Sequence, residues 1–259
     1  MTGRALIITY HGVEAGTGPL WINPGLFRAQ LDCLRDCGAR AVTLTELADG
    51  LVNGGLPRRS VAITFDDGFR SVVETAVPLL AERGMRATIF CVAGSLGRDN
   101  RWPAEPQSVP RRPLASAAAL TELAALGFEI GAHGMQHVPL PAASAEQLRQ
   151  EIVDSKQSLE QQLGTSVTSF AYPYGAKPGA SGRALVEATY SWACTTRAGY
   201  ASAATKPWEL PRVDIHYLRR PALLGRAAAG TLEGYLELRR RAAWVRRRVV
   251  NDYLEAPAI

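Results

Sequence analysis

The chain has 259 residues, 47% of them hydrophobic, and a formal net charge of +5. This composition allows one sizeable core, and α/β barrels of this length commonly form a single domain. No apolar run approaches the roughly 20 residues that cross a membrane, and the first apolar run is too short for a signal peptide. Cys33 and Cys37 are four residues apart and lack the close paired spacing of a zinc knuckle. We expect reduced, structural thiols in a cytoplasmic protein, at Cys33, Cys37, Cys91 and Cys194.

Strand-like and helix-like segments alternate along the chain. We predict strands at 5–10, 41–44, 61–65, 87–92, 128–130, 167–172, 192–195 and 213–215. Helices are predicted at 24–38, 45–51, 72–83, 116–126, 144–164, 184–188 and 232–254, with a long proline-rich loop at 94–113. This order indicates a parallel α/β sheet or barrel with helices outside. We expect one domain over 1–259, with a core at about 5–220 and a C-terminal helical extension at about 221–259.

The predicted C-terminal helix is unusually basic. Its apolar side carries Leu232, Leu236, Ala243, Val250 and Leu254. The remainder is rich in arginine, at positions Arg239, Arg240, Arg241, Arg246, Arg247 and Arg248. We interpret it as a helix packed on the body with a solvated basic face. The alternative is contact with an anionic membrane surface or an acidic partner. A nucleic-acid surface is not expected.

Two adjacent carboxylates, Asp66 and Asp67, follow the predicted strand at 61–65, and Gly68 comes next. Taken alone, this pattern is typical of a polar turn. Two neighbouring acids repel each other when both are ionised, so each needs a partner. A functional interpretation therefore depends on metal ligands or bases elsewhere in the chain.

The chain has four histidines, at His11, His133, His137 and His216. His133 and His137 are four residues apart after a predicted strand, so both rings can reach one ion if the backbone turns helically there. The carboxyl ends of parallel strands meet at one edge, which would bring this pair close to the two aspartates, His11 and Tyr174. Two histidines and a carboxylate leave open positions on a divalent metal, as a hydrolytic site requires.

Three motifs resemble those of the polysaccharide deacetylases of the NodB-homology type, carbohydrate esterase family 4. They are Thr64-Phe65-Asp66-Asp67-Gly68, His133-Gly134-Met135-Gln136-His137 and Tyr172-Pro173-Tyr174-Gly175. The second motif normally has serine or threonine where this chain has Gly134. Tyr10-His11 and Leu210-Pro211-Arg212 are similar to features of the exopolysaccharide-type branch, whose first strand ends in Tyr-His.

The resemblance implies a deformed (β/α)7–8 barrel and metal-dependent hydrolysis of the N-acetyl group of an amino sugar. Asp66 would be the general base, and the metal ligands would be Asp67, His133 and His137. Zinc suits such ligands best, and cobalt or nickel also fits them. The backbone amide of Tyr174 would help to hold the oxyanion.

The chain departs from the family pattern in two places. The arginine that normally precedes the third motif's proline by two residues is Ala171 here, and we predict that Arg212 supplies its charge from a neighbouring strand end. The alternative is that Arg212 is an ordinary surface residue. The histidine that protonates the leaving amine has two candidates, His11 and His216, of which we favour His11. Trp102 in the long loop is the aromatic residue that we expect to stack on a sugar.

The expected substrate is an N-acetylated saccharide, whether a polysaccharide, a lipid-linked precursor or a small glycoside. One alternative is a metal-dependent hydrolase of a non-sugar amide or imide. Another is a catalytically inactive carbohydrate-binding homologue. The sequence sets neither the chain length of the substrate nor the oligomeric state.

Overall fold

One strongly curved sheet organises the fold. The computed structural model describes residues 3–16, 18–104 and 109–242. Six parallel strands lie in the order β1-β5-β6-β7-β8-β9, and nearly all their residues are buried because both faces of the sheet are covered. These strands are β1 (Arg4–Tyr10), β5 (Ser60–Phe65), β6 (Thr88–Cys91), β7 (Glu129–Ala132), β8 (Ser169–Ala171) and β9 (Trp192–Cys194).

The segment after β9 brings the two edges of the sheet together. Leu210 forms a parallel bridge with Cys194 of β9, and a few residues later Val213 pairs with Ile8 of β1. The stretch 210–214 therefore links the last strand to the first, and the sheet is the deformed α/β barrel that was predicted. The remaining strands are β2 (Gly12–Val13) and β3 (Trp21–Ile22), which pair with each other, β4 (Arg40–Val42) beside β5, and β10 (Ala201–Ser202) and β11 (Val213–Asp214) beside β1.

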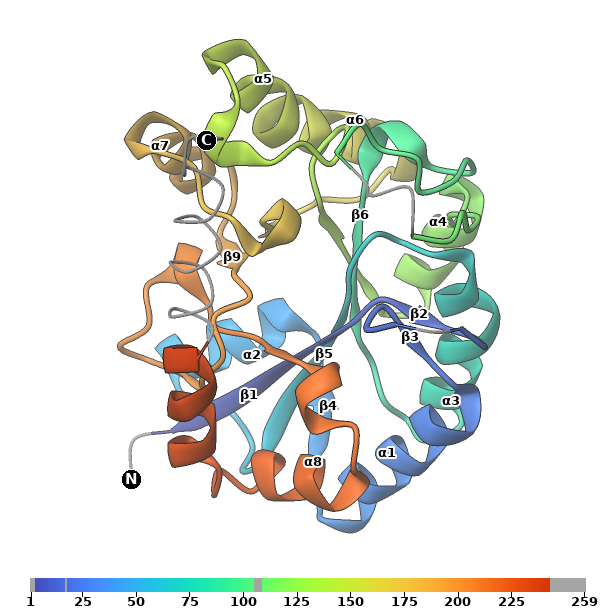
Figure 1. The fold of residues 1–259 in the computed structure, drawn as a ribbon, viewed down its shortest axis with the longest axis vertical. Helices are drawn as coiled ribbons and strands as arrows, with labels where there is room; N and C mark the ends of the chain where they lie inside the picture. The colour runs from blue at the N-terminus through green and yellow to red at the C-terminus, as the bar shows by residue number, and fades with distance from the viewer. Residues whose placement is uncertain (1–2, 17, 105–108, 243–259) are drawn as a thin grey trace, which may run out of the picture.

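Helices surround the curved sheet (Figure 1). They are α1 (Pro24–Asp36), α2 (Leu44–Asn53), α3 (Val77–Ala81), α4 (Ala117–Ala125), α5 (Ala145–Arg149), α6 (Ser155–Leu163), α7 (Ala180–Thr189) and α8 (Pro221–Ala228). Helix α2 packs against side chains that face the inside of the barrel, such as Ala5 and Ile7. Two π-helical segments, Val72–Ala76 and Gln150–Asp154, lead into α3 and α6. Short 3₁₀ turns lie at Ala93–Ser95, Leu140–Ala142, Pro173–Gly175, Pro207–Glu209 and Ile215–Leu218.

The helix starts follow the capping residues in the sequence. Asn23 accepts a hydrogen bond from the amide of Gly25 at 2.8 Å, and Ser144 forms a capping box with Gln147. α2 begins one residue before the predicted helix at 45–51, because Thr43 is its N-cap and forms a capping box with Glu46. The side chain of Thr45 instead donates to Glu129 at 2.8 Å.

Alternation along the strands divides the core into two parts. On β1, Leu6, Ile8 and Tyr10 belong to the cluster that packs under the helices. Ala5 and Ile7 belong to a smaller cluster, together with side chains of the other strands that face the inside of the barrel. This period of two continues past the strand ends, and it decides which residues point into the mouth of the barrel.

The C-terminal region packs against the body as far as it is described. α8 lies on α1, where the Gln30 side chain donates to the carbonyl of Arg219 at 3.1 Å. Residues 233–242 are helical, Leu232 and Leu236 are buried, and Arg240 approaches Glu233 at 3.6 Å. Of the predicted helix, Ala243, Val250, Leu254, Arg246, Arg247 and Arg248 lie outside the described residues. Within the described ranges, no helix combines the length and the hydropathy needed to cross a membrane.

Candidate active site

An aspartate–arginine pair lies at the inner mouth of the barrel. Asp66 continues the inward alternation of β5, and its amide donates to the carbonyl of Tyr10 on β1 at 2.9 Å. Arg212, in the segment that joins the sheet edges, donates to both carboxylate oxygens of Asp66 at 2.6 and 2.7 Å. Arg212 is fully buried and Asp66 is 3% exposed. The interpretation of Arg212 as a surface residue was therefore wrong.

The electrostatics of this pair favour an ionised aspartate. Burial alone would raise the pKa of Asp66, but the charge of Arg212 and its hydrogen bonds outweigh it, and the pKa lies below its ordinary value. The arginine is itself fixed, because its Nε donates to the carbonyl of Thr195 at 3.2 Å and its Nη1 to the hydroxyl of Thr64 at 3.2 Å. Asp66 is thus held as a rigid carboxylate beside Asp67.

Asp67, His133 and His137 form a buried triangle of potential ligand atoms. The Nε2 atoms of the two histidines lie 3.2 Å apart. Oδ1 of Asp67 is 3.6 Å from Nε2 of His133 and 3.5 Å from Nε2 of His137. Metal–nitrogen bonds of 2.0–2.1 Å in a tetrahedral site would place ligands roughly 3.3–3.4 Å apart, so the three atoms have the spacing that a divalent cation requires.

The protonation of the two histidines also suits a cation. His133 donates from Nδ1 to the carbonyl of Ala171 at 2.8 Å, which leaves the lone pair on Nε2. Burial lowers the pKa of His133 to about 4 and that of His137 well below its ordinary value. Both rings are therefore neutral near pH 7, and their lone pairs are available to a metal.

The loop that carries the two histidines does not turn helically, which was the condition that we set for both rings to reach one ion. Residues 133–138 have no helical structure, and Gly134 (φ 84°) and His137 (φ 59°) both lie in the left-handed region. Asp67 also has a positive φ of 72°. The ligand atoms converge because of these unusual backbone angles, and the i, i+4 geometry of a helix has no part in it.

Two aromatic side chains flank His137. The Tyr174 ring lies 4.4 Å from the His137 ring between centroids, and the Trp102 ring lies 4.9 Å from it on the described part of the long loop. Tyr174 follows β8 with φ of 57° and is 40% exposed. Trp102 is only 6% exposed, so it packs against the site and does not present an open face for a sugar. The expectation that Trp102 stacks on the substrate was therefore wrong for this conformation.

The two candidate acids lie in different surroundings. His11 is half-buried just after β1, and a positive charge on it would lower the pKa values of Asp66, His133 and His137. His216 is exposed in the turn after β11, where its amide donates to Asp214 and its ring packs on Tyr217. His11 is thus close enough to influence the charged groups of the site, whereas the contacts given for His216 are with its own neighbours in the chain.

Sequence reasoning missed Glu151. Its carboxylate accepts hydrogen bonds from the backbone amides of Met135 and Gln136, at 3.1 and 2.9 Å, in the loop between the two histidines. The signal in the sequence was a charged residue on the apolar side of the helix at 144–164, next to Ile152.

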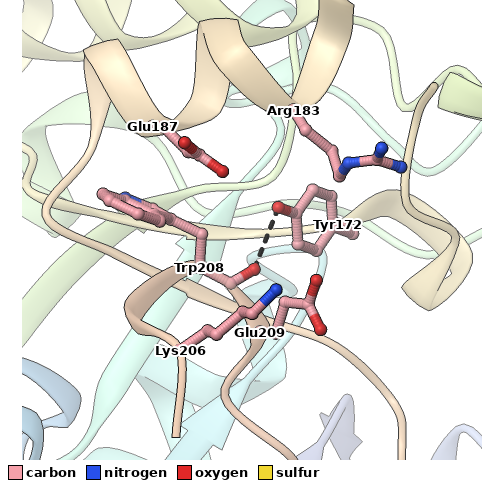
Figure 2. A pocket seen from close by; sticks show the side chains of 6 residues that line it. All are labelled: Tyr172, Arg183, Glu187, Lys206, Trp208 and Glu209. Carbon is pink, nitrogen blue, oxygen red and sulfur yellow. Dashed lines mark hydrogen bonds between the residues drawn. The ribbon is translucent and has the colours of Figure 1, made fainter. Parts of the chain in front are cut away.

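A small cavity lies on the other side of the third motif. Figure 2 shows its lining by Tyr172, Arg183, Glu187, Lys206, Trp208 and Glu209, and its volume is about 60 Å³. Tyr172 alternates outward from the barrel, and its hydroxyl donates to the carbonyl of Trp208 at 3.0 Å. The cavity contains none of the predicted catalytic or metal-binding residues.

Comparisons with known proteins agree with the fold and the motifs. The chain is 28% identical to YxkH of Bacillus subtilis over 88% of its own length and 75% of that protein. It is 28% identical to the poly-beta-1,6-N-acetyl-D-glucosamine N-deacetylase of Staphylococcus aureus, over 60% of this chain, and spans about half (53%) of that relative's length.

Solved structures with the same fold include IcaB from Ammonifex degensii, with a TM-score of 0.73, 27% identity, and coverage of 88% of this chain and 97% of that one. The deacetylase PplD of Streptococcus pyogenes, solved with acetate, has a TM-score of 0.71 and 26% identity, with coverage of 83% and 93%. The profile of the polysaccharide deacetylase family matches residues 53–193, more than half of the chain. The chain therefore belongs to the polysaccharide deacetylase family.

Proposed function

We propose that this protein is a metal-dependent N-deacetylase, which hydrolyses the N-acetyl group of an amino sugar and releases acetate. The observation that carries the proposal is the adjacency of two units in one barrel mouth: the Asp66–Arg212 pair and the ligand triangle of Asp67, His133 and His137. One neighbouring aspartate can serve as base while the other binds the metal.

The triangle would hold one divalent cation, and its two imidazoles and one carboxylate suit zinc, with cobalt or nickel as further candidates. When bound, the cation supplies Lewis-acid polarisation of the acetyl carbonyl and lowers the pKa of water.

The chain's own residues supply the proton transfers. Asp66, kept ionised by Arg212, accepts a proton from the attacking water. The backbone amide of Tyr174, at the exposed turn after β8, donates to the oxyanion that forms on the acetyl carbon. His11 donates a proton to the amine of the sugar as the C–N bond breaks. This assignment leaves His216 without a part in the reaction.

The relatives support the proposed substrate class. The staphylococcal relative is named for deacetylation of poly-beta-1,6-N-acetyl-D-glucosamine, and the PplD structure holds acetate, the product expected here. We propose an N-acetylated saccharide for this chain.

A panel assay tests the proposal. Acetate release is measured from β-1,6- and β-1,4-linked N-acetylglucosamine oligomers and from a non-sugar N-acetyl amide, with and without a chelator. We expect release from at least one oligomer, loss of release with the chelator, and recovery on addition of zinc. Release from the non-sugar amide alone would contradict the saccharide assignment, and release that resists the chelator would contradict the metal dependence.

A further inference from the structure

A buried carboxylate that the proposed reaction does not use binds the backbone of the histidine loop. Glu151 is 2% exposed. Its Oε1 accepts from the amide of Gln136 at 2.9 Å, and its Oε2 accepts from the amides of Met135 and Val138 at 3.1 and 3.3 Å. Among the described residues no lysine or arginine forms an ion pair with it, so backbone donors compensate the buried charge.

The helix that carries Glu151 is locally rewound. Glu151 lies in the π-helical segment between α5 and α6, an arrangement that occurs frequently at functional sites. The hydroxyl of Ser155 donates to the carbonyl of Glu151 at 2.6 Å, so this carbonyl of the altered turn has a hydrogen-bond partner. Ile152 is fully buried in the core, which fixes this part of the helix relative to the sheet.

Gly134 and Glu151 fit each other. Gly134 has a φ of 84°, and a Cβ at this position would lie 2.3 Å from Oε2 of Glu151 and 3.4 Å from Cγ of Pro173. The carboxylate thus fills the space that a side chain at position 134 would need. A side chain at position 134 would therefore force the Glu151 carboxylate to move, at a φ that L residues rarely adopt.

His137 depends on its backbone for its orientation. The ring of His133 is fixed by its Nδ1 bond to Ala171, whereas Nδ1 of His137 is buried without a hydrogen-bond partner among the described residues. His137 also has the left-handed φ of 59°. Such a conformation is strained for a non-glycine residue and persists only where its surroundings impose it. The amides on both sides of His137 in the chain, those of Gln136 and Val138, are held by Glu151.

We propose that Glu151 is a positioning residue for the metal site, whose carboxylate fixes residues 134–138 and thereby holds Nε2 of His137 opposite His133 and Asp67. This inference rests on the proposed function in one respect, that the triangle binds a metal. Glu151 acts through His137 and touches neither the cation nor the substrate.

The test is the metal affinity of Glu151→Gln. The substitution keeps the shape of the side chain but replaces one acceptor oxygen with an NH₂ group that faces backbone donors. The dissociation constant for Zn²⁺ is measured by competition with a chromophoric chelator, and the visible spectrum of the Co²⁺-substituted protein reports the ligand geometry. We expect Zn²⁺ binding to weaken by about 10–100-fold and the Co²⁺ spectrum to change.

Two further variants separate positioning from stability. Glu160→Gln on α6 is the matched control, because Glu160 also accepts from a loop amide, that of Val167 at 2.9 Å, but lies away from the site. It should lower the unfolding temperature of the metal-free protein and leave the Zn²⁺ affinity unchanged. Glu151→Asp keeps the charge on a shorter side chain, and its affinity should lie between those of wild type and Glu151→Gln.

The outcomes are distinct. If Glu151→Gln is less stable but binds Zn²⁺ with wild-type affinity and an unchanged Co²⁺ spectrum, Glu151 is only structural and the inference is wrong. If Glu151→Gln does not fold, Glu151→Asp is measured in its place, and wild-type Zn²⁺ affinity in that variant would show that the inference is wrong. Failure of wild type to bind any divalent metal would instead contradict the proposed function, so the two failures are distinguishable.

Discussion

Replacing Arg212 by methionine removes the partner of Asp66 while keeping most of the apolar stem. In the native protein Arg212 is fully buried, donates twice to Asp66, and stacks its guanidinium over the Phe90 ring at 5.4 Å. In the variant, the carboxylate of Asp66, which is 3% exposed, has lost the guanidinium that pairs with it. We therefore expect both lower stability and lower activity.

The magnitude follows from the burial of the pair. Removing one partner of a buried ion pair costs about 3–5 kcal/mol, because the other charge stays buried and uncompensated. Loss of a correctly ionised general base typically costs about 10²–10⁴-fold in rate. If Asp66→Asn is added to Arg212→Met, the charge is gone, and the double variant should be more stable than Arg212→Met alone.

Urea denaturation and kcat/KM measured on the same preparations test this prediction. Arg83→Met is the matched control, since Arg83 also pairs with a carboxylate, Asp32 at 2.9 Å, on the helical exterior. That variant should lose less stability and keep kcat/KM. The reasoning would be refuted if Arg212→Met were as stable and as active as Arg83→Met.

Three other predictions concern the rest of the site. His11→Ala should lower kcat/KM by about 10²-fold or more while His216→Ala leaves it unchanged, and the reverse order would identify His216 as the acid. Gly175→Ala would place a Cβ 2.0 Å from Oγ1 of Thr196 at a φ of 67°. The variant should therefore unfold at a lower temperature, and its kcat should fall because Tyr174 moves. Wild-type unfolding temperature and kcat would contradict the assigned turn. Asp67→Ala should abolish zinc binding as measured by metal analysis, because one corner of the triangle is lost, and retention of stoichiometric zinc would exclude Asp67 as a ligand.

The parallel strands and the position of the site followed from local patterns. The alternating order of segments predicted that the carboxyl ends of the strands would meet, with Asp66 and Asp67 at one of them. The pairing of Arg212 with Asp66 was predicted from the absence of arginine at Ala171, and the structure shows the contact. The catalytic roles of Asp66 and Arg212 remain predictions.

The parts that could not be predicted depend on distant contacts. The positive φ of His137 reflects hydrogen bonds to Glu151, fourteen residues further along, and nothing in the local sequence indicates them. From the sequence, Trp102 is an aromatic residue in a loop, and only the folded structure shows that its ring packs on His137. Thr43 and Thr45 are both suitable N-cap residues by their side chains. The structure distinguishes them, because the amide and the hydroxyl of Thr45 donate to Glu129, which is distant in the sequence.

The central claim is that adjacent aspartates divide two tasks, with Asp66 as base and Asp67 as metal ligand. The most direct measurement determines zinc content and acetate release on the same samples of wild type and Asp66→Asn, with an N-acetylglucosamine oligomer as substrate. We predict one zinc per chain in both proteins and acetate release from wild type only. Wild-type turnover by Asp66→Asn, or loss of zinc from it, would contradict this division of tasks.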